Sequence, residues 1–302
     1  MKNKLVTALL LLSFILLTAD GAVACVGARP HGMGGAFIGV ADDINAVYWN
    51  PAGLVQLKES AVTWTRTLNN RDVVNYDDFL AVGSYNEKLG LAYAVGYINI
   101  DDYYLDYILR YLGYDTIGYV DKKNQWLIFS LAKKITPKLS IGGNIRYMFY
   151  DIRIDDYWGY FLGEDSAGFI GLDLSLFYQV DDRFAFGLLI QDINRPKFTL
   201  FERKWYYIRN VRPGISYRIT DSMLVSASIY DLLEEIPEEE LMGNRFRIGI
   251  EQKIDPVSIR FGLENGNKTF GLGINKNHFV LDYVILGDDL GDTHMLGFTY
   301  KF

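Results

Sequence analysis

Three histidines, His31, His278 and His294, are the imidazoles that could hold a metal ion or act as a general base. A zinc site needs ligands that converge on one point. The strand pattern described below places His278 in a short turn. It places His294 at the start of the last strand, on the opposite side of the fold, so the two cannot meet. No motif sets a nucleophile beside any of these rings. We therefore expect no enzyme, no metal site and no cofactor.

Charged side chains inside otherwise apolar segments are the second group with chemical potential. We expect the following to face the interior of the fold: Arg146, Asp173, Arg212, Arg218, Arg247, Glu251, Arg260, Glu264, Asp282 and Lys301. One interpretation is an ion-pair lattice that braces a wet lumen and docks Asp42, Asp43 and Asn50 of the preceding segment. The other is a polar conduction path.

The segments that carry these charges alternate between apolar and polar residues. From Leu139 to Phe149 every second residue is apolar or glycine, and the pattern recurs over residues 170–178, 246–250 and 257–263. A period of two predicts a strand with one apolar and one polar face. Arginine and glutamate in mid-strand favour a water-filled barrel lumen over a soluble sandwich. Tyrosine, phenylalanine and tryptophan near the strand ends are typical of membrane-interface girdles.

The connections between strands sort by length. We count about fourteen strands and expect a closed antiparallel transmembrane β-barrel. An even number of strands places both chain ends on one side of the membrane. They are expected to begin near residues 61, 79, 89, 125, 139, 168, 184, 211, 223, 245, 257, 269, 278 and 295. Short turns, predicted to be periplasmic, lie at 86–88, 136–138, 181–182, 220–222, 255–256 and 275–277. Long loops, predicted to be extracellular, lie at 69–78, 99–124, 153–167, 194–210 and 232–244.

The first 24 residues have the layout of a secretory signal peptide. Lys2 and Lys4 precede an apolar run from Leu5 to Leu17, and a small-residue sequence, Ala22-Val23-Ala24, follows it. Cleavage after Ala24 is favoured, and lipid modification of Cys25 is the alternative. A single cysteine allows no internal disulfide. The net charge of −7 makes nucleic acid an improbable partner.

Residues 25–58 form neither a periodic strand nor a low-complexity linker, and we expect them to be a compact hatch inside a barrel of residues 59–302. We expect Asp42 or Asp43 to cap a short helix through Trp49, Asn50 to end it and Pro51 to prevent its continuation. The glycines do not match a phosphate-binding loop. The hatch motif comprises Gly32, Gly34, Gly35, Asp42, Asp43, Asn50, Pro51 and Ala52.

This segment resembles the N-terminal hatch of FadL-like outer-membrane barrels, with their Asn-Pro-Ala signature at residues 50–52. Its Gly-Met-Gly-Gly-Ala-Phe run at 32–37 and Ala-Asp-Asp run at 41–43 are similar to the PorV/PorQ family, as are residues 168–196 and 286–302. The resemblance implies a fourteen-stranded barrel with an N-terminal plug. It also implies either transport of hydrophobic molecules or a part in type IX protein secretion.

Two further features concern partners. Residues 102–113 carry aromatic and apolar side chains at helical spacing, which predicts a short amphipathic helix in the loop 99–124. With the loop near residue 205 it would offer a surface for a hydrophobic ligand or a protein partner, formed by Tyr103, Tyr104, Tyr107, Tyr111, Trp205 and Tyr206. The last strand ends in Tyr300 and Phe302 and resembles the signal that the barrel assembly machinery binds.

The sequence leaves three functional hypotheses. The first is a plugged barrel, surrounded by outer-membrane lipid, that lets a small hydrophobic molecule cross passively when the plug rearranges. The second is a PorV-like accessory of protein secretion that acts through contact with secreted proteins. The third is a structural outer-membrane protein.

Overall fold

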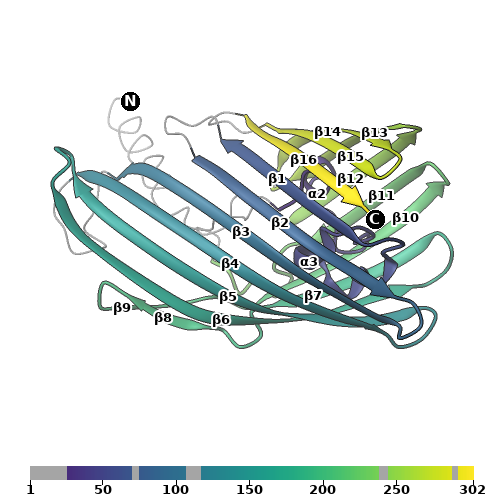
Figure 1. Cartoon of the computed structure of the whole chain (residues 1–302), viewed down its shortest axis with the longest axis horizontal. Helices are drawn as coiled ribbons and strands as arrows, with labels where there is room; N and C mark the ends of the chain where they lie inside the picture. The colour runs from purple at the N-terminus through teal and green to yellow at the C-terminus, as the bar shows by residue number, and fades with distance from the viewer. Residues whose placement is uncertain (1–25, 70–74, 107–116, 238–243, 288–291) are drawn as a thin grey trace, which may run out of the picture.

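The computed structural model describes residues 26–69, 75–106, 117–237, 244–287 and 292–302. Its main element is a closed antiparallel barrel of fourteen strands, which confirms the predicted fold class (Figure 1). The barrel strands are β1 (Ala61–Asn69), β2 (Asn75–Asn86), β3 (Leu91–Asp106), β4 (Gly118–Lys134), β5 (Leu139–Asp156), β6 (Phe161–Gln179), β7 (Phe184–Gln191), β10 (Asn210–Thr220), β11 (Met223–Ile229), β12 (Phe246–Ile254), β13 (Val257–Glu264), β14 (Asn267–Lys276), β15 (Phe279–Leu286) and β16 (Thr293–Lys301). β1 closes the barrel by pairing with β16, where Ala61 faces Lys301 and Asn69 faces Thr293.

The barrel wall is much taller on one side than on the other. Strands β3 to β6 contain 16, 17, 18 and 19 residues, whereas β11 to β16 contain between 7 and 10. A tilted strand needs about 9–11 residues to cross a bilayer. The long strands therefore extend several residues past the short ones, at the end opposite the short turns (Figure 1).

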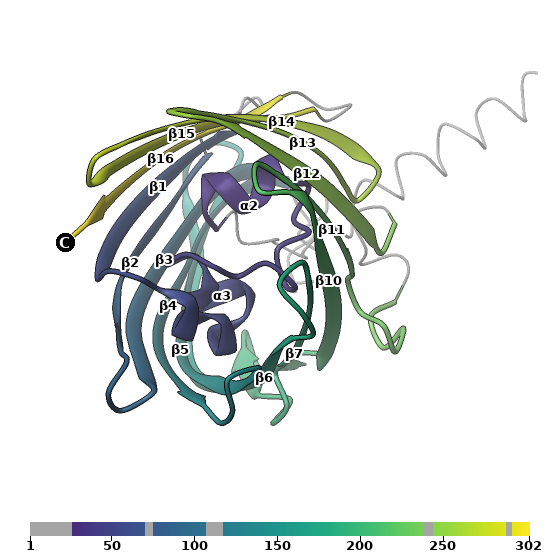
Figure 2. The same cartoon turned by 90° about the vertical axis from the view of Figure 1, so that its right-hand side faces the viewer.

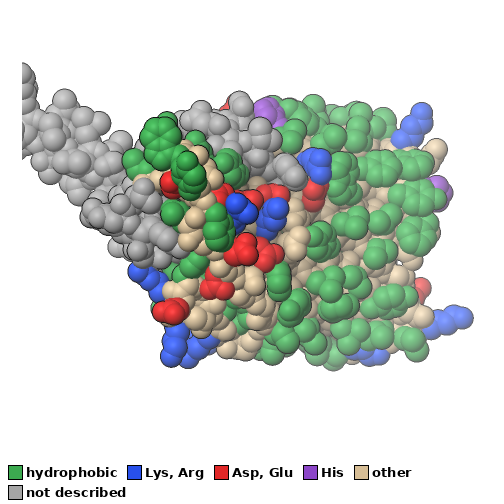
Figure 3. All heavy atoms as spheres, turned by 60° about the vertical axis from the view of Figure 1, so that its left-hand side comes forward, with side chains coloured by type: hydrophobic (Ala, Val, Ile, Leu, Met, Phe, Trp, Pro, Cys, Tyr) green, Lys and Arg blue, Asp and Glu red, His purple; other side chains and the backbone are tan. Residues whose placement is uncertain are grey.

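The outside of the barrel is apolar. Along the strands exposed and buried residues alternate, and the exposed ones include Leu131, Ile145 and Ile248, each more than half exposed. Figure 3 shows hydrophobic side chains covering its right-hand part, with charged side chains gathered nearer the extended end. Among the described residues, no helix is both long enough and apolar enough to cross a membrane.

The segment 26–57 lies inside the barrel (Figure 2). It contains α2 (Ala28–Gly32), α3 (Ala46–Trp49) and the 3-10 helix η1 (Pro51–Gln56). α2 packs against β13 to β16, while η1 packs against β2 to β6 on the other side of the lumen. Met33, Phe37 and Trp49 are fully buried. These helices are too short to be stable alone, so the barrel wall must hold them in place.

The prediction of a helix within residues 99–124 is wrong where the structure describes that range. β3 continues to Asp106 and β4 begins at Gly118, with Ile100 paired to Asn124. The aromatic residues fit a period of two as well as a helical one, and pairing between neighbouring strands decides in favour of the sheet. Tyr107 and Tyr111 lie outside the described residues, and the side chain of Tyr104 is not described.

The other predicted loops are also shorter than expected. The connection between β5 and β6 spans only 157–160, and β2 already begins at Asn75. The range 194–210 contains a second sheet, the hairpin of β8 (Lys197–Leu200) and β9 (Arg203–Tyr206). Phe201 at its tip packs against Val120 and Ile154 on the inner face of the long strands. This hairpin therefore covers part of the extended wall from inside.

The hatch helix also differs from its prediction. Helix α3 begins at Ala46, and its N-cap residue Asn45 makes no side-chain capping bond. Asp43 instead accepts the backbone N–H of Asn45 at 2.8 Å. As predicted, α3 ends at Trp49, with Asn50 in an extended conformation as its C-cap. Pro51 then opens the separate helix η1 at its first position, where the missing N–H costs nothing.

Candidate functional site

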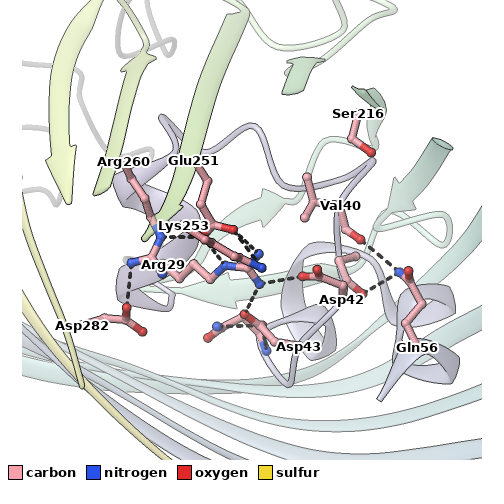
Figure 4. Close-up of polar contacts among 12 residues, drawn as sticks. Arg29, Val40, Asp42, Asp43, Gln56, Ser216, Glu251, Lys253, Arg260 and Asp282 are labelled. Atoms are coloured by element: carbon pink, nitrogen blue, oxygen red, sulfur yellow. Dashed lines mark hydrogen bonds and ion pairs between the residues drawn. The ribbon is translucent and has the colours of Figure 1, made fainter. Parts of the chain in front are cut away.

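The hatch is joined to the wall through Arg29 on α2 (Figure 4). Its guanidinium donates two hydrogen bonds to Glu251 on β12, at 2.8 and 2.9 Å. Its third nitrogen donates to Asp42 at 2.6 Å and to Asp43 at 2.8 Å. Burial alone would lower the pKa of Arg29, but Asp42, Glu251 and Asp43 together raise it well above the usual arginine value. Arg29 is therefore charged whenever the hatch is seated.

The same network continues into the wall. Arg260 on β13 donates to Glu251 at 2.7 Å and to Asp282 on β15 at 2.6 Å. Lys253 approaches Glu251 to 3.4 Å from a more exposed position. A continuous row of alternating charges thus runs from β15 through β13 and β12 into the hatch. This arrangement is the bracing lattice that one of the two sequence interpretations predicts.

The Asn-Pro-Ala signature anchors the opposite side of the hatch. The side-chain amide of Asn50, which is fully buried, donates to the carbonyls of Ile38 at 2.9 Å and Leu176 at 3.1 Å. The N–H of Ala52 donates to Ser175 at 2.9 Å, and its carbonyl accepts from Ser140 at 2.8 Å. Pro51 contributes no N–H between them. The signature therefore binds hatch backbone to β5 and β6.

Inward-facing glycines let the hatch backbone lie directly on the wall. A Cβ atom at Gly187 would stand 2.0 Å from the carbonyl oxygen of Ile38, and one at Gly262 would stand 2.2 Å from the nitrogen of Gly34. Gly34 and Gly35 themselves have φ of 61° and 67°, a region that disfavours other residues. Any larger side chain at these positions would push the hatch away from the wall.

A second ion-pair cluster lies on the long-strand side. Arg146 on β5 donates to both oxygens of Asp173 on β6 at 2.9 Å, and to Asp192 at 2.6 Å. Its guanidinium also lies 5.0 Å from the ring of Trp126. Asp192 directly follows β7, so this cluster fixes the start of the connection that carries the β8–β9 hairpin.

Aromatic side chains fill the lumen between the hatch and that hairpin. Phe198 on β8 stacks on Phe169 of β6 with ring centroids 4.4 Å apart, and on Tyr150 of β5 at 5.6 Å. The hydroxyls of Tyr150 and Tyr207 are 2.7 Å apart. Burial raises the pKa of Tyr207 well above its usual value, so the phenol stays neutral. These rings join the same apolar cluster as Trp49 of the hatch.

A third group lies where the hatch meets β10, β12 and β13. His31 contacts Glu264 at 2.7 Å, and Arg247 approaches the other oxygen of Glu264 to 3.6 Å. Arg212 and Arg247 lie 4.3 and 4.8 Å from the ring of Tyr230. All four polar side chains are almost completely buried. This group differs from the other two clusters because its hydrogen bonding is incomplete.

The structure brings most of the predicted inward charges into these clusters and leaves two outside. Arg218 has inward parity but lies exposed near the short-turn end of β10, so its placement in the lumen is corrected. Lys301, next to the end of the chain, is only half-buried. Both positions are close to strand ends, where parity no longer determines burial because the lumen opens to solvent.

The other predicted site residues lie apart from the lumen clusters. Tyr103 on β3 stacks on Tyr119 at 5.4 Å and faces outward, while Trp205 and Tyr206 on β9 are exposed. Tyr300 and Phe302 stack at 5.9 Å on the outer surface. These residues remain candidates for partner contacts and for the assembly signal.

Several residues of the lumen clusters escaped the sequence argument. Arg29 could have been found, because a single arginine in a glycine-rich, apolar hatch needs a carboxylate partner. Asp192 carried no signal, since it lies beyond the end of its strand. Phe198 and Tyr207 lie in the connection between β7 and β10. The alternation of apolar and polar residues does not predict how that connection folds.

No protein-family model matches the sequence, and neither does any curated protein sequence. Solved structures do match. The toluene transporter TbuX of Ralstonia pickettii superposes with a TM-score of 0.70 at 15% identity, over 93% of this chain and 99% of that one. The toluene transporter TodX of P. putida gives 0.67 at 11% identity, over 91% and 98%. A Pseudomonas aeruginosa FadL homologue gives 0.61 at 10% identity, over 92% and 98%. This chain therefore has the fold of the FadL-like barrels.

Proposed function

We propose that this protein is an outer-membrane barrel through which a small hydrophobic molecule crosses passively, with the hatch as its gate. The observation that carries the proposal is the continuous apolar cluster inside the lumen. It runs from Trp49 of the hatch through Trp126 to Phe169, and the hairpin residue Phe198 packs against it. A purely structural barrel has no need of an aromatic interior next to a separate plug.

The apolar exterior supports the membrane location. Large hydrophobic side chains are exposed all over the barrel surface, which soluble monomers rarely show and which a hydrocarbon environment explains. The neighbours TbuX and TodX are toluene transporters, which makes a monoaromatic hydrocarbon the first substrate to test.

The test compares uptake of radiolabelled toluene by cells that produce the protein or a variant. Phe198→Asp places a charge in the apolar cluster and should lower uptake about tenfold or more, because a carboxylate in an apolar path is costly to desolvate. Thr199→Asp is the matched control, since Thr199 is the next residue of β8 and is exposed. Equal uptake with and without the protein would refute the proposal.

A second candidate function is a PorV-like role in protein secretion. It is favoured by the exposed aromatic residues between β5 and β6, where Trp158 is 79% and Tyr160 is 72% exposed. A native pull-down with mass spectrometry of lipids and proteins separates the two candidates. A secreted protein that is recovered with the wild type and lost with Trp158→Ser/Tyr160→Ser would support the secretion role. Recovery of hydrophobic small molecules without a protein would support transport.

A further inference from the structure

The β8–β9 hairpin concentrates positive charge in an otherwise acidic protein. Residues 195–209 hold five basic side chains and one carboxylate, whereas the whole chain has a net charge of −7. Glu235 pairs with the two arginines that flank the hairpin. Lys197 and Lys204 are exposed, and no ion pair joins either of them to a carboxylate of the described residues. The hairpin therefore presents positive charge that the described part of the chain does not offset.

The register of the hairpin places both lysines on one face. Lys197 on β8 is paired with Tyr206 on β9, and paired residues of antiparallel strands share a face. Lys204 lies two positions before Tyr206, so the period of two puts it on that face as well. Lys197 and Lys204 are therefore diagonal neighbours, about 7–8 Å apart. Lys197, Lys204 and Tyr206 are called the basic hairpin face below.

The opposite face of the hairpin packs into the barrel. Phe198, the next residue of β8, stacks on Phe169 of β6 with ring centroids 4.4 Å apart. Leu200, two positions further along β8, is buried. The basic hairpin face therefore points away from the apolar cluster of the lumen. Its two like charges are held close together by packing that they do not share, and an anion bound between them would relieve their repulsion.

The stacking of Phe198 on Phe169 also fixes the height of the hairpin along the wall, beside β6 (Figure 1). Toward the short turns, the next outward side chain of β6 is Ile170, which is apolar and 50% exposed. Toward the extended end, the outward side chains are Ser166 and Glu164, which are polar and exposed. The outer surface thus changes from apolar to polar at the level of the hairpin, as it does where hydrocarbon meets lipid head groups.

We propose that the basic hairpin face binds the phosphate of an anionic lipid head group in the surrounding membrane. Trp205 and Tyr206, which are 37% and 65% exposed, belong to the residue types enriched at the head-group level. A phosphate monoester carries nearly two negative charges, which match two lysines. Its acyl chains then lie along the apolar surface around Ile170. The proposal rests on the membrane location that the proposed function includes, but not on transport.

Titration of the detergent-purified full chain with lipids in mixed micelles tests the binding. Phosphatidic acid carries a phosphate monoester, and diacylglycerol with the same acyl chains lacks only that group. We expect phosphatidic acid to bind about tenfold more tightly or better, because each lysine near an anionic lipid surface adds to the attraction. Equal affinity for the two lipids would overturn the proposal. So would inorganic phosphate that binds as tightly as phosphatidic acid, because the ligand would then be a free anion.

Variants locate the site. Lys197→Gln/Lys204→Gln should remove the preference for phosphatidic acid. Lys88→Gln/Lys276→Gln removes the same charge from two exposed residues of the short turns and should leave the preference unchanged. Lys197→Arg/Lys204→Arg keeps both charges and should retain the preference, which separates loss of charge from loss of the hairpin fold. A full preference in the first glutamine variant would place the phosphate elsewhere and contradict the assignment.

Acetylation of amines in lipid nanodiscs tests where the lysines lie. Lys197 and Lys204 should react more slowly in discs that contain phosphatidic acid than in discs of phosphatidylcholine alone, because a bound phosphate blocks the ammonium groups. Lys276, at the other end of the barrel, should react equally in both. Protection of Lys197 and Lys204 in intact cells but in neither kind of disc would show that a protein covers them, which would refute the lipid site.

These measurements use purified protein and lipid, so their outcome is separate from that of the toluene uptake experiment. A preference for phosphatidic acid without toluene uptake would support the lipid site and remove only transport. Toluene uptake without that preference would remove only the lipid site.

Discussion

Arg29 and Glu251 are joined by two hydrogen bonds of 2.8 and 2.9 Å, although 222 positions separate them along the chain. One belongs to the hatch and the other to the barrel wall. Because Glu251 is fully buried, losing Arg29 leaves a carboxylate with too few partners in an environment that desolvates it. This pair is therefore a buried electrostatic bond between hatch and wall.

Arg29→Gln should lower the free energy of hatch opening by roughly 3–5 kcal/mol, the usual cost of removing one partner of a buried ion pair. Hydrogen exchange of residues 28–49 measures it. Lys253→Gln, which removes a mostly exposed cation 3.4 Å from the same carboxylate, is the control and should change little. Similar exchange in both variants would mean that the ion pair does not hold the hatch.

Asn50→Ala should lower the free energy of unfolding by about 1–3 kcal/mol, because the buried carbonyls of Ile38 and Leu176 lose a shared hydrogen-bond donor. Asn50→Asp should be worse than alanine, since a carboxylate cannot donate and would repel both carbonyl oxygens. Thermal unfolding, followed by the loss of heat-resistant mobility in gels, ranks the three proteins. If aspartate were tolerated as well as asparagine, the donor role of Asn50 would be wrong.

Gly262→Ala should displace the hatch while leaving the barrel closed. The added Cβ would lie 2.2 Å from the nitrogen of Gly34, a distance that backbone must relieve by moving. Gly287→Ala, whose nearest neighbour would be 3.5 Å away, is the matched control. We expect faster amide hydrogen exchange in the hatch of Gly262→Ala and not of Gly287→Ala. Unchanged exchange in Gly262→Ala would show that the barrel wall moves to accommodate the Cβ and the hatch does not.

Glu235 joins two connections at the extended end, through hydrogen bonds from Arg195 and Arg209. Hydrogen bonds from Arg209 and Arg195 hold the pKa of Glu235 below its ordinary value. The ion pairs of Glu235 are therefore fully present at a pH above the usual glutamate pKa. They are lost as the pH falls through the lowered pKa of Glu235. Glu235→Gln should speed trypsin cleavage after Arg209 at neutral pH, whereas Arg195 precedes Pro196 and is not a trypsin site.

High salt should also speed trypsin cleavage of the wild type, because salt screens the exposed ion pairs of Glu235. Glu202→Gln, an exposed loop glutamate for which no ion pair is recorded among the described residues, serves as the control. Cleavage that is insensitive to both salt and Glu235→Gln would show that the loops are held by other contacts.

The sequence by itself determined the wall. Alternation with a period of two predicts a strand that has one apolar face, so strand positions such as Leu139 and Val257 followed from local pattern alone. It also identified most wall charges that meet the hatch, because a charge at inward parity in mid-strand has few other environments. At Arg218 the same rule failed, since a strand end opens to solvent.

Only the tertiary structure decided which of those charges pair. Arg29 finds Glu251 and Arg146 finds Asp192 across distances in sequence that no periodicity encodes. Folding of the β8–β9 hairpin into the lumen likewise depends on Phe198 meeting Phe169. Alternation fixes which face a side chain takes, but the register between strands and the course of the hatch fix its neighbours, and those depend on contacts throughout the closed barrel.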